Sequence, residues 1–217
     1  MRFDDQRKRM VETNLIPRGI LDQKVIEAFL KVPRERFVSA QWKEFSYQDH
    51  PLSIGFKQTI SQPYIVALMM SLIEIKETDK VLEIGTGCGY QTALLAEIAE
   101  EVFTIERIEE LLISAKKTLK NLEYTNIHFK IGDGCLGWVN TLPPVSEFDK
   151  IIVSAASPDL PKALLSQLKI NGKMIVPQGS SSRQELIVYE KLENEVLTHY
   201  HGGCVFVPLI GEGAWDN

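Results

Sequence analysis

Residues 80–90, KVLEIGTGCGY, decide the fold of this chain. Val81, Leu82 and Ile84 form an almost continuous apolar run, which is typical of a parallel strand covered on both faces. Alternating glycines follow, and glycine lets the backbone turn tightly and approach a ligand where a Cβ would clash. Good helix formers over residues 92–99 come next. Strand, glycine turn and helix in this order predict an α/β fold with a nucleotide-like ligand at the turn.

The spacing within the turn separates two classes of ligand. Gly85, Gly87 and Gly89 are followed by Tyr90, which stands where a dinucleotide fingerprint has its last glycine. A turn that needs glycine for its geometry alone is an alternative at this point. Glu83 lies inside the strand just before the turn. The resulting acidic-x-Gly-x-Gly-x-Gly loop resembles the first motif of the Rossmann-like methyltransferases, which cups the methionine end of S-adenosylmethionine.

Length and composition limit the class of protein. At 217 residues, with 44% hydrophobic and 24% charged residues, the chain is long enough for one well-packed α/β domain and short for two. We therefore expect one domain over residues 1–217, with an N-terminal helical segment (1–75) and a Rossmann-like core carrying a C-terminal β extension (76–217). The net charge of −5 argues against a broad electrostatic contact with nucleic acid.

The cysteines and the apolar stretches indicate in which cellular compartment the protein is expected. Cys88, Cys135 and Cys204 lie far apart without a Cys-x-x-Cys pair, so neither a disulfide framework nor a zinc ribbon is predicted. His199 and His201 would share a strand face near Cys204, but surface contacts are the better interpretation and no metal is assigned. The N-terminus lacks the apolar core of a signal peptide, and no stretch is long enough to span a bilayer. We expect a cytoplasmic protein without membrane contact.

Residues 55–63, GFKQTISQP, are expected to form a polar turn that leads into a helix, with Pro63 in its first turn. Thr59 and Ser61 would then lie at the mouth of a helix N-terminus. A hydroxyl there can cap free backbone N–H groups or meet an anion, and both interpretations of Ser61 are open. A hydrolase nucleophile is disfavoured, because the surroundings lack the Gly-x-Ser-x-Gly pattern.

Two acidic residues follow later strands. Residues 101–105 predict a strand that ends at Glu106, 21 residues after Gly85. A carboxylate in that position can accept hydrogen bonds from the ribose hydroxyls of an adenosine. Residues 127–131 predict the next strand, followed by Asp133 between two glycines. Its carboxylate can approach the exocyclic amine of an adenine, although a plain Asp-Gly turn explains the same residues.

The rest of the core completes an alternating pattern. Residues 148–153 and 173–176 predict two more strands, joined by a helix over residues 160–168 that stops at residues 171–172. The small residues of SAASP, 154–158, leave room for a cleft in front of the sheet. Alternating strands and helices imply a doubly wound, mainly parallel sheet with its ligands at the carboxyl ends of the strands.

Beyond Pro177 the pattern changes. Residues 185–191, 197–200 and 205–209 read as strands separated by turns, which predicts antiparallel C-terminal strands.

Several motifs together closely resemble the protein-L-isoaspartate O-methyltransferase family. The glycine loop alone indicates only a methyltransferase, whereas TISQP at residues 59–63 and FVPL at residues 206–209 are much narrower. The matching stretches cover nearly the whole chain and are VPR at 32–34, FV at 37–38, QTISQP at 58–63, residues 83–89, GDG at 132–134, residues 149–158 and VPL at 207–209.

The resemblance implies transfer of the methyl group of S-adenosylmethionine to the α-carboxylate of L-isoaspartyl residues in damaged proteins and peptides. It implies repair, since the ester closes to a succinimide that hydrolyses in part to normal aspartate. Ser61 is the implied active-site residue, and we interpret its hydroxyl as orienting the carboxylate. The implied cofactor contacts are Thr59, Ile60, Glu83, Gly85, Gly87, Gly89, Glu106, Asp133 and Gly134, and the implied substrate contacts are Ile60, Ser61, Val205, Phe206 and Val207.

Two features depart from the family pattern, and three other functions are alternatives. Eukaryotic members often carry Asp at the position of Glu106, and their tail differs beyond Leu209. One alternative is a methyltransferase for a small molecule or RNA, although the acidic balance and the lack of a basic aromatic stripe weigh against RNA. An NAD-dependent oxidoreductase is opposed by Tyr90, and a non-catalytic binding module would merely retain the fold. The oligomeric state is not readable from the sequence.

Overall fold

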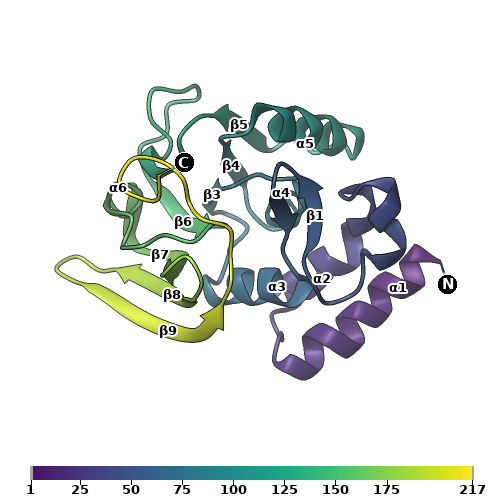
Figure 1. Ribbon diagram of the computed structural model, residues 1–217. Helices are drawn as coiled ribbons and strands as arrows, with labels where there is room; N and C mark the ends of the chain where they lie inside the picture. Colours follow the sequence, from purple (N-terminus) through teal and green to yellow (C-terminus); the bar gives the residue numbers. More distant parts are fainter. Residues whose placement is uncertain (1, 217) are drawn as a thin grey trace.

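The computed structural model describes residues 2–216 and is built around a central sheet (Figure 1). Within the described residues its seven strands follow the order β5-β4-β3-β6-β7-β8-β9. Strands β3 to β7 run parallel to one another, whereas β8 pairs antiparallel with β7 and β9 antiparallel with β8 at one edge. The strands are β3 Lys80–Ile84, β4 Glu101–Glu106, β5 Ile127–Ile131, β6 Phe148–Val153, β7 Leu168–Gly179, β8 Gln184–Lys191 and β9 Val196–Cys204. The predicted doubly wound sheet with antiparallel C-terminal strands is confirmed.

The order of the sheet places a ligand site at the end of β3. Strand β3 lies between β4 and β6, so the chain builds the sheet outward in one direction and then crosses to the other side. Ile84 pairs with Ile105 on one side and Val153 on the other, so the three strands end together. A crevice outside the carboxyl ends of strands at such a reversal point is where α/β sheets bind ligands.

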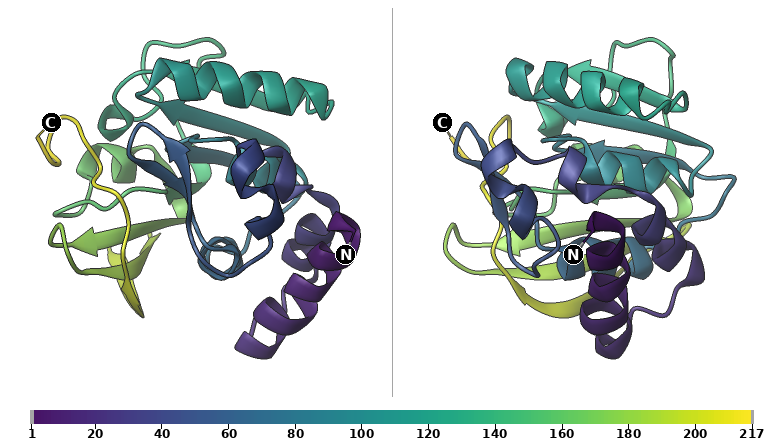
Figure 2. Two further views of the ribbon diagram at one scale, coloured as in Figure 1. Left: turned by 45° about the vertical axis from the view of Figure 1, so that its right-hand side comes forward. Right: turned by 90° about the vertical axis from the view of Figure 1, so that its right-hand side faces the viewer.

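Helices cover both faces of the sheet. Alternate residues of β3 point to opposite faces: Val81 joins a core cluster with the N-terminal helices, α3 and α4, while Leu82 joins a second cluster with α6. Figures 1 and 2 show α1 and α2 on the opposite side of the molecule from the C-terminal tail. The α-helices are α1 Phe3–Met10, α2 Gln23–Lys31, α3 Pro63–Leu72, α4 Tyr90–Ala96, α5 Glu109–Asn121 and α6 Lys162–Ser166.

The segment predicted as a polar turn at residues 55–63 is instead part of a hairpin. Strand β1 (Leu52–Gly55) pairs antiparallel with β2 (Gln58–Ile60). Phe56 and Lys57 join the strands with φ values of 52° and 58°, the left-handed conformation that two-residue hairpin turns require. This short hairpin holds Thr59 and Ile60 beside the carboxyl ends of the sheet, where a free loop would have left them mobile.

Two predictions about the second half of the chain were wrong. Residues 205–209 are not a strand of the sheet; they make isolated backbone contacts with Ala156, which donates to the Val207 carbonyl at 2.8 Å and accepts from Leu209 N–H at 2.8 Å. The helix predicted over residues 160–168 is shorter, because β7 begins at Leu168 and pairs with Phe148. Asn171, expected as the helix stop, lies within β7 with a φ of 65°, a conformation that Asn tolerates.

Candidate active site

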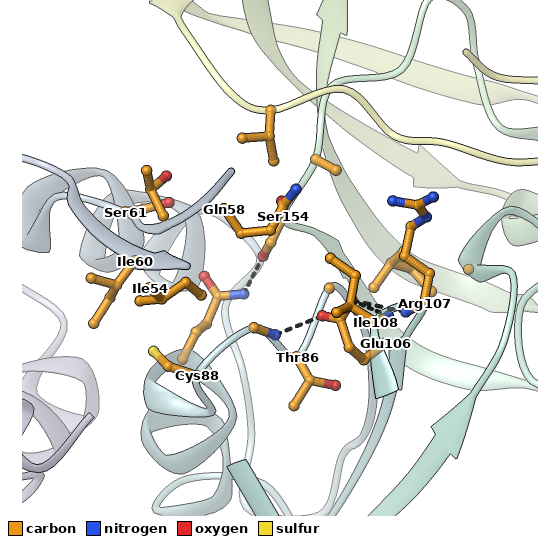
Figure 3. A pocket seen from close by; sticks show the side chains of 18 of the residues that line it. Ile54, Gln58, Ile60, Ser61, Thr86, Cys88, Glu106, Arg107, Ile108 and Ser154 are labelled. Atoms are coloured by element: carbon orange, nitrogen blue, oxygen red, sulfur yellow. Dashed lines mark hydrogen bonds between the residues drawn. The ribbon is translucent and has the colours of Figure 1, made fainter. Parts of the chain in front are cut away.

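A cavity opens at the carboxyl ends of β3, β4 and β6 (Figure 3). Ligand sites of α/β sheets lie at this edge. Several predicted site residues come together in its wall: Thr59, Ile60, Ser61, Gly85, Gly87, Glu106, Gly134 and Val207. Others do not line it: Glu83, Gly89, Asp133, Val205 and Phe206.

The glycine loop forms the floor of the cavity. Gly85, Gly87 and Gly89 have φ values of 95°, 55° and 88°, which favour glycine. A Cβ on Gly87 would stand 3.3 Å from the side chain of Ile54, which also lines the cavity. A Cβ on Gly89 would instead meet Leu119 of α5 at 3.0 Å. Gly87 therefore keeps the cavity open, whereas Gly89 lets the loop pack against a helix.

Glu106 ties the glycine loop to the end of β4. Its Oε2 accepts a hydrogen bond from Gly87 N–H at 2.8 Å, and its Oε1 accepts from Arg107 N–H at 2.8 Å and Ile108 N–H at 2.9 Å (Figure 3). A carboxylate oxygen can accept more than one hydrogen bond, so the Glu106 carboxylate keeps acceptor capacity for a ligand. The predicted ribose contact thus fits the geometry, and the same carboxylate also holds the loop in shape.

Glu83 lies beneath the loop and has no exposed surface. Its carboxylate accepts hydrogen bonds from Thr92 at 2.6 Å, Thr104 at 2.7 Å and the Gln91 amide at 3.2 Å. Burial raises the pKa of Glu83 to about 7, and these hydrogen bonds oppose the shift. Gln91 also donates to Ser154 Oγ at 2.6 Å in the cavity wall, so Glu83 supports the wall through another side chain.

Asp133 is held between its own turn and the C-terminal tail. Oδ1 accepts from Cys135 N–H at 2.8 Å, and Oδ2 accepts from Glu212 N–H at 2.8 Å. The tail approaches so closely that a Cβ on Gly211 would stand 2.0 Å from Oδ1. The neighbouring Gly134 does line the cavity, where a Cβ would stand 2.4 Å from Ile84 Cγ2. Glycine at both positions permits these close approaches.

Ser61 stands at the cavity wall just before α3. The N-cap of α3 is Gln62, without a side-chain capping bond, and the first available N–H, of Tyr64, goes to Asp49 Oδ1 at 3.0 Å. Within residues 2–216 the Ser61 hydroxyl has no hydrogen-bond partner, so the capping interpretation is wrong here. The Ser61 backbone carbonyl, in contrast, is held by Arg34 Nη2 at 2.7 Å.

The C-terminal tail forms the opposite wall. Val207, Pro208, Leu209 and Ile210 line the cavity, while Val205 is 78% exposed just outside it. The Phe206 N–H donates to the Gln184 side chain at 2.9 Å. The tail thus runs from the exposed Val205 into the wall of the cavity that Ser61 also lines.

The cavity wall also contains a thiol. Cys88 lines the cavity, but burial raises the pKa of its thiol to about 11, which keeps it protonated and a poor nucleophile near neutral pH. Across residues 2–216 no group of three or more His, Cys, Asp or Glu side chains is arranged to hold a metal ion. No helix in that range is long and apolar enough to cross a membrane.

Sequence reasoning missed several residues of the cavity wall. Gln91 was adjacent to a motif that was singled out, whereas Gln58 and Ser154 belonged to motifs without being named as site residues themselves. Ile54 and Ile108 carry no signal in their own sequence neighbourhood, because the hairpin and the end of β4 bring them to the cavity. Arg34 lies in a motif whose function the sequence did not reveal.

The fold and this cavity define the chain as an S-adenosylmethionine-dependent methyltransferase. A solved protein-L-isoaspartate O-methyltransferase superposes with a TM-score of 0.84 at 28% identity, over 96% of this chain and 67% of that one. A Plasmodium falciparum beta-aspartate methyltransferase, in complex with S-adenosyl-L-homocysteine, gives a TM-score of 0.81 at 28% identity, over 94% and 98% of the two chains.

Comparison of the sequence identifies one family within this class of enzymes. Residues 5–214 match the family model described as protein-L-isoaspartate(D-aspartate) O-methyltransferase. The protein-L-isoaspartate O-methyltransferase of Petrotoga mobilis is 52% identical over 99% of this chain and 100% of its own length, and that of Dictyoglomus turgidum is 50% identical over 100% and 96%. The chain belongs to the protein-L-isoaspartate(D-aspartate) O-methyltransferase family. The predicted family, enzyme class and cofactor are confirmed.

Proposed function

We propose that this enzyme transfers the methyl group of S-adenosylmethionine to the α-carboxylate of L-isoaspartyl residues in damaged proteins and peptides, as a repair reaction. The observation that carries the proposal is the cavity itself, in which Ser61 and the tail from Val207 face the loop tied by Glu106. The full-length match to the family supports the same substrate. A small molecule or RNA as acceptor has no such support.

The residues present fit the cofactor. A Cβ at Gly87 or Gly134 would narrow the cavity or displace its wall, so both glycines preserve room for a ligand. Gly85, Gly87 and Gly134 would hold the cofactor by close backbone approach, Glu106 would bind the ribose hydroxyls, and Thr59 and Ile60 would close the other side. The bound sulfonium supplies an electrophilic methyl group.

Placement of the acceptor is the main task of the protein. An α-carboxylate is already ionised near neutral pH, so no general base is needed to prepare it. Ser61 would donate a hydrogen bond from its hydroxyl to one carboxylate oxygen, leaving the other in line with the methyl carbon. Ser61 would thereby leave that oxygen free to accept the methyl group in exchange for the sulfonium bond, and no residue would have to move a proton. Orientation of this kind contributes several kcal/mol of barrier reduction.

The tail would bind the substrate backbone. Val205 is 78% exposed and continues into Val207 at the cavity, which offers an extended edge to a peptide. Phe206 would lie between them in the same contact. Backbone recognition depends little on side chains, which suits an enzyme that acts on damaged sites in many sequences.

The cofactor roles of Glu83, Gly89 and Asp133 stay predictions, and all three residues lie outside the cavity lining. Glu83 and Gly89 would act from beneath the loop, through Gln91 and through packing on α5. Asp133 would reach the adenine amine from beside Gly134, where its carboxylate now also receives a tail N–H. We further propose that residues 1–217 act as one domain in the cytoplasm, without nucleic-acid contact; the free cysteines and the net charge of −5 support the last two points.

A paired-peptide assay tests the function. The protein is incubated with methyl-labelled S-adenosylmethionine and two peptides that differ only in isoaspartyl or aspartyl linkage. We expect base-labile label in the isoaspartyl peptide alone. Equal labelling of both peptides, or none, would overturn the proposed acceptor. Labelling of RNA or of small carboxylic acids under the same conditions would favour the alternative acceptors.

A further inference from the structure

Arg34 is a buried cation that contacts two residues of the cavity wall, Ser61 and Tyr90. It lies in a short helical turn (Arg34–Arg36) of the N-terminal segment and has no exposed surface. Its Nε donates to the Ser46 carbonyl at 2.7 Å, and its Nη2 donates to the Ser61 carbonyl at 2.7 Å. The guanidinium stands 4.7 Å from the centroid of the Tyr90 ring, in the first residue of α4 after the glycine loop.

Burial of this charge is energetically unfavourable, which is unusual for a residue with a purely structural role. Within residues 2–216 no carboxylate forms an ion pair with Arg34, and its Nη1 has no hydrogen-bond partner. Burial of the charge lowers the pKa of the guanidinium, as desolvation does for a cation. Buried charges without an ionic partner are expensive, and apolar side chains of similar volume often stabilise such sites better. The cost indicates that the position serves the site.

We propose that Arg34 is a positioning residue that fixes Ser61 relative to the glycine loop. The proposal rests on the proposed function, in which the Ser61 hydroxyl orients the acceptor carboxylate. That hydroxyl has no partner of its own among the described residues, so its place depends on the backbone that Arg34 holds. The position of the guanidinium over the Tyr90 ring links that backbone to the start of α4.

Arginine suits this role for a geometric reason. Its planar fork donates in two fixed directions while its face stacks on an aromatic ring, whereas lysine offers a point charge without this geometry. Arg34 makes three such contacts: two hydrogen bonds to backbone carbonyls and a cation–π contact with the ring of Tyr90. A displacement of about 1 Å in a positioned group can cost 100-fold in rate.

The test compares Arg34→Lys and Arg34→Met with a matched control, Tyr47→Phe. Met fills a similar volume without charge, so it covers the case in which the Lys variant does not fold. Tyr47 is buried in the same segment and hydrogen-bonds Glu35 and Arg7, but does not contact Ser61. We expect both Arg34 variants to lower kcat on the isoaspartyl peptide by about 10- to 100-fold. The Kd for S-adenosylhomocysteine should change by less than about threefold, because Arg34 does not line the cavity.

Amide hydrogen exchange gives a readout independent of catalysis. Exchange at residues 59–62 should accelerate at least about tenfold in the Arg34 variants and stay unchanged in Tyr47→Phe, which should lower only the melting temperature. Unchanged kcat and unchanged exchange at residues 59–62 in a folded Arg34 variant would overturn the proposal. If the wild-type enzyme does not distinguish the two peptides, the proposed function fails, and the exchange measurement alone still decides whether Arg34 holds Ser61.

Discussion

The hydroxyl of Ser61 is the smallest group on which the proposed reaction depends. It lines the cavity and has no partner among the described residues, so it is available to a substrate. We expect Ser61→Ala to lower kcat by about 10- to 100-fold, since a hydrogen bond to a charged group contributes about 1.5–3 kcal/mol. Affinity for S-adenosylhomocysteine, measured by calorimetry, should be retained.

Ser71→Ala is the control for this variant. Its hydroxyl is buried in α3 without a partner, and it does not line the cavity. Its removal should leave kcat within about twofold of the wild type and the fold intact. Equal rates for Ser61→Ala and the wild type would remove Ser61 from the mechanism.

Glu83 gives a pH dependence of stability. Its pKa in the folded protein is raised to about 7 from the ordinary 4.5, so folding favours the protonated carboxyl. The stability that this group contributes is complete below about pH 4.5 and is lost as the pH rises through about 7, a loss of about 3 kcal/mol. Glu83→Gln removes the titration while it keeps the shape. In urea unfolding, the stability of this variant relative to wild type should increase between about pH 5 and 8, and a constant difference would contradict the assignment.

At the scale of elements, the short turn η5 (Gly134–Leu136) must approach β3 closely. A Cβ on Gly134 would stand 2.4 Å from Ile84 Cγ2, so Gly134→Ala has to push the turn or the end of the strand aside. We expect at least about a tenfold loss of S-adenosylhomocysteine affinity and a destabilisation of about 1–3 kcal/mol. Gly203→Ala is the control, since its Cβ would meet only Gln184 O at 3.9 Å. Normal cofactor affinity in the Gly134 variant would show that η5 is adaptable.

The helices, strands and turns also show which structural features could be predicted from the sequence. The strand β3, its glycine turn and Glu106 were predictable because each depends on residues close together in sequence. The contact of Arg34 with the Ser61 carbonyl spans 27 positions, and that of Asp133 with Glu212 spans 79. Neither leaves a local pattern, because the partner atom in each case belongs to the backbone. The course of residues 205–209 was missed for a similar reason: an extended sequence does not reveal which partner it meets.

At the scale of the whole molecule, the cavity joins segments from nearly the full length of the chain. Its wall takes residues from the N-terminal hairpin, the ends of β3 and β4, the turn at Gly134 and the tail at Val207. The family resemblance could be predicted from separate short motifs because each of these segments contributes one. Their convergence depends on the order of the sheet, which places β3 between β4 and β6.

Because segments from nearly the whole chain meet at the cavity, we expect a bound ligand to raise the free energy of unfolding of the whole fold. A ligand that binds only the folded state adds about 2.7 kcal/mol at 100 times its Kd. For a chain of 217 residues this corresponds to a rise in melting temperature of about 5–10 °C with S-adenosylhomocysteine. Glu106→Ala loses hydrogen bonds to the ribose, which costs about 1–3 kcal/mol of affinity and leaves a gain below about 2 kcal/mol at the same concentration.

Calorimetric scans of both proteins, with and without the ligand, measure the two shifts. The exposed Glu110 of α5 provides the control, because Glu110→Ala removes the same charge away from the cavity and should retain the full shift. The bonds from Gly87, Arg107 and Ile108 to Glu106 also shape the loop, so Glu106→Ala should melt at a lower temperature even without ligand. A full ligand shift in Glu106→Ala would place the ribose away from β4.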